Sequence, residues 1–194
     1  MLFLSFSIYL LTMIKLGKIV KEIMDVPPTN NVQQASTNVL SSDFINYIKF
    51  VENGQKVGYD KDKKLWFPHK SKEGGFPTIG YGHKIQTNHE LTAFKKGISD
   101  GDVENLLKSD LTIANKHVHE YIKNRYKVDV MLTQKQSEML TDFAFNLGSL
   151  KKFPKFVDAV LRNRWDIVKK EYQRSSGGKL LTGRNTSFYD RFLK

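Results

Sequence analysis

The sequence predicts an α+β fold in which a small antiparallel β region precedes a larger helical region. Glycine, proline and aromatic residues dominate residues 57–85, a composition typical of short strands joined by tight turns. Beyond Glu90, apolar residues recur at helical spacing almost to the end of the chain. With 194 residues, of which 40% are hydrophobic and 12% aromatic, the chain is long enough to bury one core.

Residues 1–40 differ in composition from the rest of the chain. Residues 1–14 are almost wholly apolar but too few to cross a bilayer as a helix, which takes about 20 residues. Extended to Met24, the segment gains lysines and becomes amphipathic. Three interpretations stay open: a membrane-associating segment over residues 1–24, an atypical export signal, or a stretch that precedes a true start at Met13. Residues 26–37 are polar, uncharged and contain two prolines, so we expect a linker before a domain over residues 41–194.

The predicted domain begins with a helix and continues into the β region. Ser41, Ser42 or Asp43 can cap this helix, and Gly54 breaks it. Its apolar positions follow helical spacing; they are Phe44, Ile45, Ile48 and Val51. In the β region, tight turns are expected over residues 60–64 and 72–75.

The helical region opens with two helices that have recognisable caps. Ser99 and Asp102 predict a capped start, and the buried stripe that follows is Val103, Leu106, Leu107, Leu111, Ala114, Val118 and Ile122. A second helix begins at the capping box of Thr133 and Gln136, and Gly148 ends it.

Three shorter helices are expected after Gly148. Pro154 suits the first turn of a helix that runs towards Asn163. A second is patterned by Trp165, Val168 and Tyr172, and residues 175–178 are expected to end it. The last is predicted over residues 186–193.

The net charge of +11 calls for an anionic partner or environment, such as nucleic acid, acidic lipid or an anionic cell-wall polymer. A nucleic-acid binder would need its lysines clustered on one face with stacking aromatics. Here lysine and arginine are spread along the whole chain, so we expect no nucleic-acid partner. The absence of cysteine excludes disulfides, thiol catalysis and cysteine-based metal sites.

The most informative residues are Glu52 and the segment 76–83. Glu52 follows the apolar positions of the first predicted helix, and residues 76–83 (FPTIGYGH) place Thr78 ahead of a glycine-spaced turn. This layout resembles the active-site half of phage-type lysozymes, the T-even phage-like endolysins and muramidases of glycoside hydrolase family 24. The spacings from Glu52 to Tyr59 and from Thr78 to His83 match that family.

Three later motifs extend the resemblance. Residues 143–148 (FAFNLG) are similar to the family's Phe-Asn-x-Gly turn, residues 164–166 to its late Arg-Trp-Asp, and residues 181–185 to its closing segment. The likeness thus spans residues 41–194. It implies a lysozyme-like fold with a small antiparallel β lobe and a larger all-helical lobe.

The resemblance implies an inverting muramidase that cleaves the β-1,4 bond from N-acetylmuramic acid to N-acetylglucosamine. Glu52 would protonate the leaving oxygen, while an Asp and Thr78 would hold the attacking water. Asn146 would offer its amide to the sugar N-acetyl or peptide groups, and Arg184 would face an anionic wall peptide. His83 is expected to have a structural partner. We expect bacterial peptidoglycan as partner, a monomer, and neither a cofactor nor a metal.

The second acid of the family is missing at its expected position. The family places an Asp two residues beyond the Tyr and six before the Thr, where this chain has Lys61 and Lys72. About a dozen residues, around 63–74, look inserted, a length that loops tolerate cheaply. Asp60 is the first choice, because the register from Glu52 is intact up to that strand. The alternatives are Asp62, His69 and Glu73.

Two other functions fit a changed second acid. A lysozyme-fold protein could bind glycan without cleaving it, and a lytic transglycosylase would use one Glu and no attacking water. Localisation also stays open between the host cytoplasm before lysis and export or membrane association through the apolar amino terminus. Roles in lysis, entry or defence would look alike in the sequence.

Overall fold

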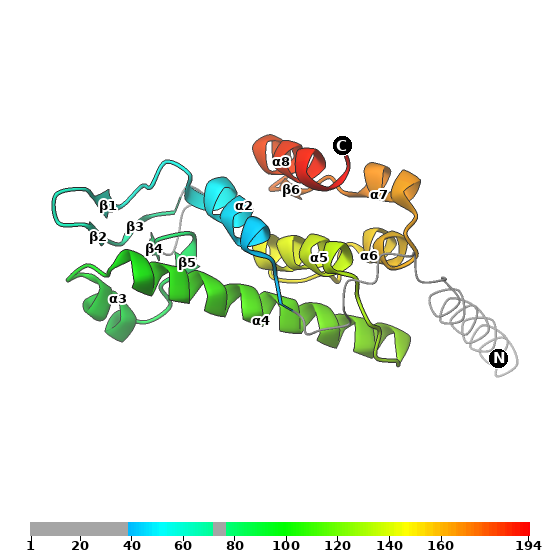
Figure 1. The fold of residues 1–194 in the computed structure, drawn as a ribbon, viewed down its shortest axis with the longest axis horizontal. Helices are drawn as coiled ribbons and strands as arrows, with labels where there is room; N and C mark the ends of the chain where they lie inside the picture. The colour runs from blue at the N-terminus through cyan, green and yellow to red at the C-terminus, as the bar shows by residue number, and fades with distance from the viewer. Residues whose placement is uncertain (1–38, 72–76) are drawn as a thin grey trace, which may run out of the picture.

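A computed structural model describes residues 39–71 and 77–194 and has the lysozyme-like α+β fold (Figure 1). Residues 1–38 and 72–76 lie outside the described residues. The interpretations of the apolar segment, the linker, the turn expected at 72–75 and the candidate Glu73 therefore have no structural counterpart here. Within the described ranges, no helix is long and apolar enough to span a membrane.

The first described helix, α2 (Ser42–Asn53), begins as the sequence predicts. Ser41 is its N-cap, and the Ser41 hydroxyl accepts a hydrogen bond from the backbone N–H of Phe44 at 3.1 Å. The same hydroxyl donates to Glu138 at 2.6 Å, which ties the start of α2 to the helix that contains Glu138. Phe44 and Ile48 are fully buried, and the helix ends at Gly54.

The β lobe contains two small antiparallel sheets. β1 (Tyr59–Asp60) and β2 (Leu65–Trp66) form a hairpin whose turn occupies residues 61–64, within the predicted range 60–64. β3 (His69–Lys70), β4 (Pro77–Ile79) and β5 (His83–Lys84) form a sheet in that order. The register sets His69 opposite Thr78. Trp66, Ile79, Ile85 and Val103 make up the core of this lobe.

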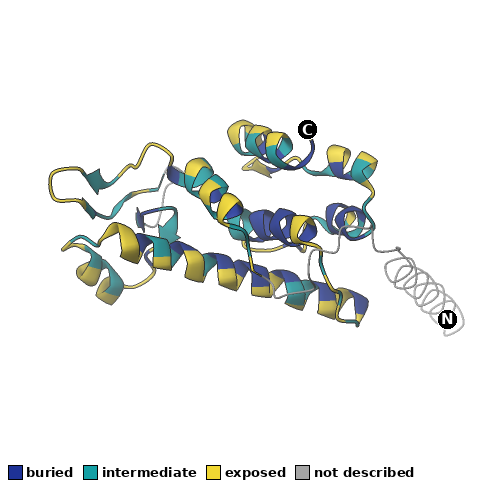
Figure 2. Cartoon of the chain, viewed as in Figure 1, coloured by how far each residue is buried: buried dark blue, intermediate teal, exposed yellow. Residues whose placement is uncertain are grey.

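The long helix α4 (Asp100–Tyr126) connects the two lobes (Figure 1). Its predicted capping box is present: the Ser99 hydroxyl accepts a hydrogen bond from the backbone N–H of Asp102, and the Asp102 carboxylate accepts one from the backbone N–H of Ser99. Val103 packs in the β-lobe core, whereas Leu107 and the following turns pack in the main core. One side of α4 is accordingly buried along its length and the other is exposed (Figure 2). The remaining helices of the described residues are α3 (Asn88–Phe94), α5 (Gln134–Leu147), α6 (Pro154–Leu161), α7 (Trp165–Glu171) and α8 (Thr182–Phe192).

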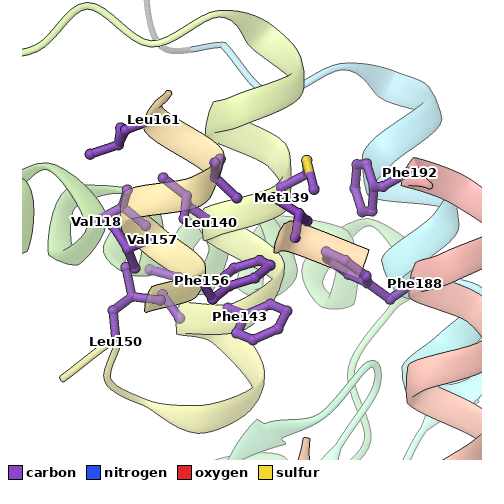
Figure 3. Packing of buried hydrophobic residues seen from close by; sticks show 14 of the residues in the cluster. Val118, Met139, Leu140, Phe143, Leu150, Phe156, Val157, Leu161, Phe188 and Phe192 are labelled. Carbon is purple, nitrogen blue, oxygen red and sulfur yellow. The ribbon is translucent and has the colours of Figure 1, made fainter. Parts of the chain in front are cut away.

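The core of the helical lobe is built around aromatic side chains of α5, α6 and α8 (Figure 3). The rings of Phe143 and Phe156 stack with centroids 3.8 Å apart, and Phe188 meets Phe143 edge-on at 5.2 Å. The predicted caps position these helices. Thr133 and Gln136 form the capping box of α5, and Gly148 ends that helix with φ 69°.

One prediction in the helical region is wrong. Residues 175–178 do not end a helix; α7 stops at Glu171, and β6 (Ser175–Ser176) pairs with β7 (Lys179–Leu180). Gly177 and Gly178 occupy the turn with φ 54° and 78°. Two consecutive residues with positive φ are what a type I′ hairpin requires, and glycine adopts them without strain. The last helix consequently starts at Thr182, earlier than the predicted residue 186.

Candidate active site

Glu52 lies in the last turn of α2, where the helical lobe meets the β lobe. It borders Gly82 in the turn after β4, because a Cβ at Gly82 would stand 3.4 Å from Glu52 Oε2. The neighbouring Asn53 fixes this junction. Its side-chain amide donates to the carbonyl oxygens of Val57 at 2.9 Å and Gly80 at 2.8 Å. The segments before β1 and after β4 are therefore both attached to the end of α2.

The Glu52 carboxylate is paired with Arg184, which extends from α8. Arg184 also contacts Asp142 of α5 at 3.4 Å. On its other oxygen, Asp142 accepts a hydrogen bond from Arg174 at 2.6 Å. Two acids and two arginines thus form one charge-balanced network, and both Asp142 and Arg174 are completely buried.

This network determines the electrostatics around Glu52. Burial alone would lower the pKa of the Arg184 guanidinium, but the nearby Glu52 and Asp142 more than compensate and raise it. The pKa of the Tyr47 hydroxyl is raised, first by burial and then by the negative charge of Asp142. Arg184 therefore stays charged and Tyr47 stays neutral beside the candidate acid.

Thr78 lies in the middle of β4 and is 7% exposed. Its strand neighbour Ile79 is fully buried in the β-lobe core. Because successive side chains of a strand point to opposite faces, Thr78 faces away from that core. His69 shares this face, since it is the cross-strand partner of Thr78.

The first-choice second acid, Asp60, lies in the β1–β2 hairpin and outside the sheet that contains Thr78. Its Oδ1 accepts hydrogen bonds from the backbone N–H groups of Asp62 and Lys63, both at 3.0 Å. The hydrogen bond from Lys63 is the main reason why the pKa of the Asp60 carboxyl lies below its usual value. Asp62 is exposed in the turn itself. In this structure, Asp60 therefore stabilises the turn.

The two candidate substrate-binding residues have different surroundings. Asn146 lies in the last turn of α5, and its Oδ1 is buried without a hydrogen-bond partner among the described residues. Arg184 was expected to face an anionic wall peptide. In the structure its guanidinium pairs with Glu52 and lies 3.4 Å from Asp142, and its contact with a wall peptide stays a prediction.

The sequence interpretation missed Asp142 and Arg174. Asp142 lies among the apolar positions of α5, and a buried acid between Thr141 and Phe143 is the one signal that could have indicated an internal partner. Nothing in the local sequence identifies Arg174 as that partner. The expected structural partners of His83 are Asp110 at 2.8 Å and Glu90 at 3.1 Å.

The two-lobed α+β fold, with an acid at the junction of the lobes, is that of a lysozyme-like hydrolase. A model of the phage lysozyme family matches residues 68–185, more than half of the chain, and the chain therefore belongs to that family. Among curated proteins, no match to the chain is found. The protein is thus a peptidoglycan hydrolase of the endolysin kind, associated with cell-wall lysis. The matched region begins downstream of Glu52.

We expect Asp142→Asn to destabilise the fold by about 3–5 kcal/mol, because it leaves the buried charge of Arg174 uncompensated. Asp166→Asn is the matched control, since Asp166 forms an exposed pair with Arg164 at 3.6 Å and should change stability by less than about 1 kcal/mol. Urea unfolding of the three proteins measures the difference. Equal effects of the two substitutions would contradict the role given to the network.

The His83 cluster predicts a pH-dependent stability. The hydrogen bond to Asp110 raises the pKa of His83, burial opposes this, and Glu90 raises it further. A raised folded-state pKa stabilises the fold below the unfolded value of about 6.5, and this contribution is lost as pH rises through the folded value. The melting-temperature advantage of wild type over His83→Asn should therefore be largest at about pH 6 and shrink towards pH 9.

His89→Asn provides the control for this pH series, because His89 is exposed on the short helix α3. The melting temperature of His89→Asn should differ from that of wild type by the same amount at every pH of the series. A constant difference between wild type and His83→Asn would show that His83 stabilises the fold through packing alone.

Proposed function

We propose that the protein is a muramidase that cleaves the β-1,4 bond from N-acetylmuramic acid to N-acetylglucosamine, with Glu52 as the general acid. The observation that supports this most is the setting of Glu52. It is an acid at the junction of the two lobes, bordered by a glycine turn and paired with a mostly buried arginine. A glycosidase needs such a group beside the glycosidic oxygen.

Arg184 has a chemical role in this proposal. When Glu52 gives its proton to the leaving oxygen, a carboxylate is produced in a partly buried site. The charged guanidinium of Arg184 stabilises that carboxylate, and Asp142 holds the guanidinium in place from the other side. Arg184 is therefore proposed to stabilise the ionised Glu52 after proton transfer, in addition to any contact with the wall peptide.

Water attacks from the opposite face of the sugar in an inverting reaction, and Thr78 is proposed to orient it. A threonine hydroxyl both donates and accepts, so it can hold water without titrating. Thr78 is positioned on the strand face that points away from the β-lobe core. The second group beside the water is proposed among Asp60, Asp62, His69 and Glu73.

Substrate binding is proposed to involve Asn146. Its Oδ1 is buried and has no hydrogen-bond partner among the described residues, and such acceptors are rare in folded proteins. An N–H of a sugar N-acetyl group or of the wall peptide would satisfy it. The net charge of +11 would retain the enzyme on an anionic wall, and we propose that it acts there as a monomer without a cofactor.

Digestion of purified peptidoglycan by the full chain tests the proposal. Wild type should release reducing muramic ends, and Glu52→Gln should reduce the rate by about 100-fold or more, because the proton donor is lost. Glu120→Gln is the control, since Glu120 is exposed on α4, and it should cleave like wild type.

The products of this digestion separate the alternatives. Anhydro-muramic ends from wild type would show a lytic transglycosylase, which needs no attacking water. Tight binding to peptidoglycan without cleavage would show a glycan-binding protein. Full activity of Glu52→Gln would remove Glu52 from the mechanism.

A further inference from the structure

His69 lies directly opposite Thr78 on the antiparallel strands β3 and β4. Side chains at such paired positions share a face of the sheet, with Cβ atoms about 4.5–5.5 Å apart. The reactive atoms of an imidazole and a hydroxyl at these positions can therefore contact one water molecule. Among the four candidates for the second group, His69 is the one with this register to Thr78 in the described chain.

The backbone around His69 leaves room for its ring close to the end of α2. A Cβ at Gly58 would lie 2.7 Å from Cδ2 of His69, so the close approach of the ring depends on a glycine, which here has φ 85°. Val57, the residue before Gly58, is hydrogen-bonded through both backbone groups to the side chain of Asn53. His69 thus packs on a segment that is attached next to Glu52.

The ring of His69 presents a nitrogen that can accept a proton. Nδ1 lies 3.1 Å from the carbonyl oxygen of Lys70, and because a carbonyl only accepts, Nδ1 carries the hydrogen. In the neutral ring, Nε2 then has a lone pair. Nε2 is buried and has no hydrogen-bond partner among residues 39–71 and 77–194. Buried acceptors without a partner are rare in folded proteins, and a water that entered between His69 and Thr78 on a small movement of the covering side chains would satisfy this one.

The aspartates of the β1–β2 hairpin are less suited to act as the base. Asp60 already accepts two backbone hydrogen bonds and pairs with Lys63 at 3.5 Å. These contacts favour its ionised form without a proton and so weaken it as a base. Asp62 is exposed in the turn of a separate sheet.

We propose that His69 is the catalytic base of this lysozyme, in the place of the aspartate that the family uses. The inference rests on the function proposed above. Nε2 of His69 takes a proton from the water that Thr78 orients, and the water oxygen bonds to the anomeric carbon. The bond from that carbon to the bridging oxygen breaks, and Glu52 gives its proton to this oxygen. The products are an inverted reducing end and a free 4-hydroxyl; solvent then returns the proton from His69 to Glu52.

Two substitutions at His69 test this step in the full chain, with soluble glycan strands as substrate. His69→Ala removes the ring, whereas His69→Asn keeps a short amide that can still donate to the Lys70 carbonyl. Both should reduce the release of reducing ends by about 100-fold or more while the melting temperature stays close to that of wild type. Lys116→Ala, at an exposed position of α4, is the control and should remain active.

Added imidazole provides a readout that a structural role would not change. It should restore part of the activity of His69→Ala, because the free ring can enter the space left by the side chain, and it should leave Glu52→Gln inactive. Failure of imidazole to restore a folded His69→Ala would overturn the proposal.

The remaining outcomes separate this inference from the proposed function. Activity of either His69 variant within about threefold of wild type would overturn the inference alone. If Asp60→Asn abolished activity in that case, Asp60 would be the base. A wild type that releases no reducing ends would overturn both the inference and the muramidase function on which it rests.

Discussion

The buried carboxylate of Asp142 organises the structure around the candidate acid. Two ionised groups with no solvent exposure, Asp142 and Arg174, are costly to desolvate unless their geometry and hydrogen bonds offset that cost. Here Asp142 accepts from two arginines, and Arg174 lies over the rings of Phe143 and Phe188 at 4.5 and 5.2 Å. Because Arg184 also pairs with Glu52, the same carboxylate connects α5, the segment after α7, α8 and α2. The position of the acid is therefore coupled to the packing of the helical core.

The fold was predictable where short stretches of sequence determine local structure. Capping boxes at Ser99 and Thr133 and the helix stop at Gly148 each depend on hydrogen bonds within a few residues, and all three are confirmed. The hairpin at residues 175–180 was missed, because a Gly-Gly pair can end a helix as well as form a type I′ turn. The Asp142 network was not predictable, since its members are brought together only by tertiary packing.

Candidates for the acid and for the water-orienting residue could be chosen from the sequence. The second group beside the water could not, because it falls near residues 63–74, which look inserted when compared with the family pattern. Glu52 and Thr78 were selected from motifs that resemble the phage-type lysozymes, and their roles stay predictions; the family model matches residues 68–185, a range that includes Thr78 but not Glu52. Spacing could not identify the second group, because an insertion changes which residues become strand partners. Register depends on backbone pairing, which sequence spacing alone does not determine. His69 was one alternative among several until its pairing with Thr78 distinguished it.

The longer β region also suggests how an aspartate could be replaced without loss of the water site. In this chain β1 and β2 close a hairpin of their own, in which Asp60 satisfies backbone groups of the turn. In the same stretch, which looks inserted when compared with the family pattern, β3 pairs with β4 and sets the side chain of His69 beside Thr78. In the proposed mechanism the attacking water needs a hydrogen-bond acceptor at this point, and an imidazole nitrogen without a hydrogen provides one as a carboxylate does. The insertion would thus supply the base through strand pairing, while Glu52 keeps its position through the independent contacts of Asn53 and Arg184.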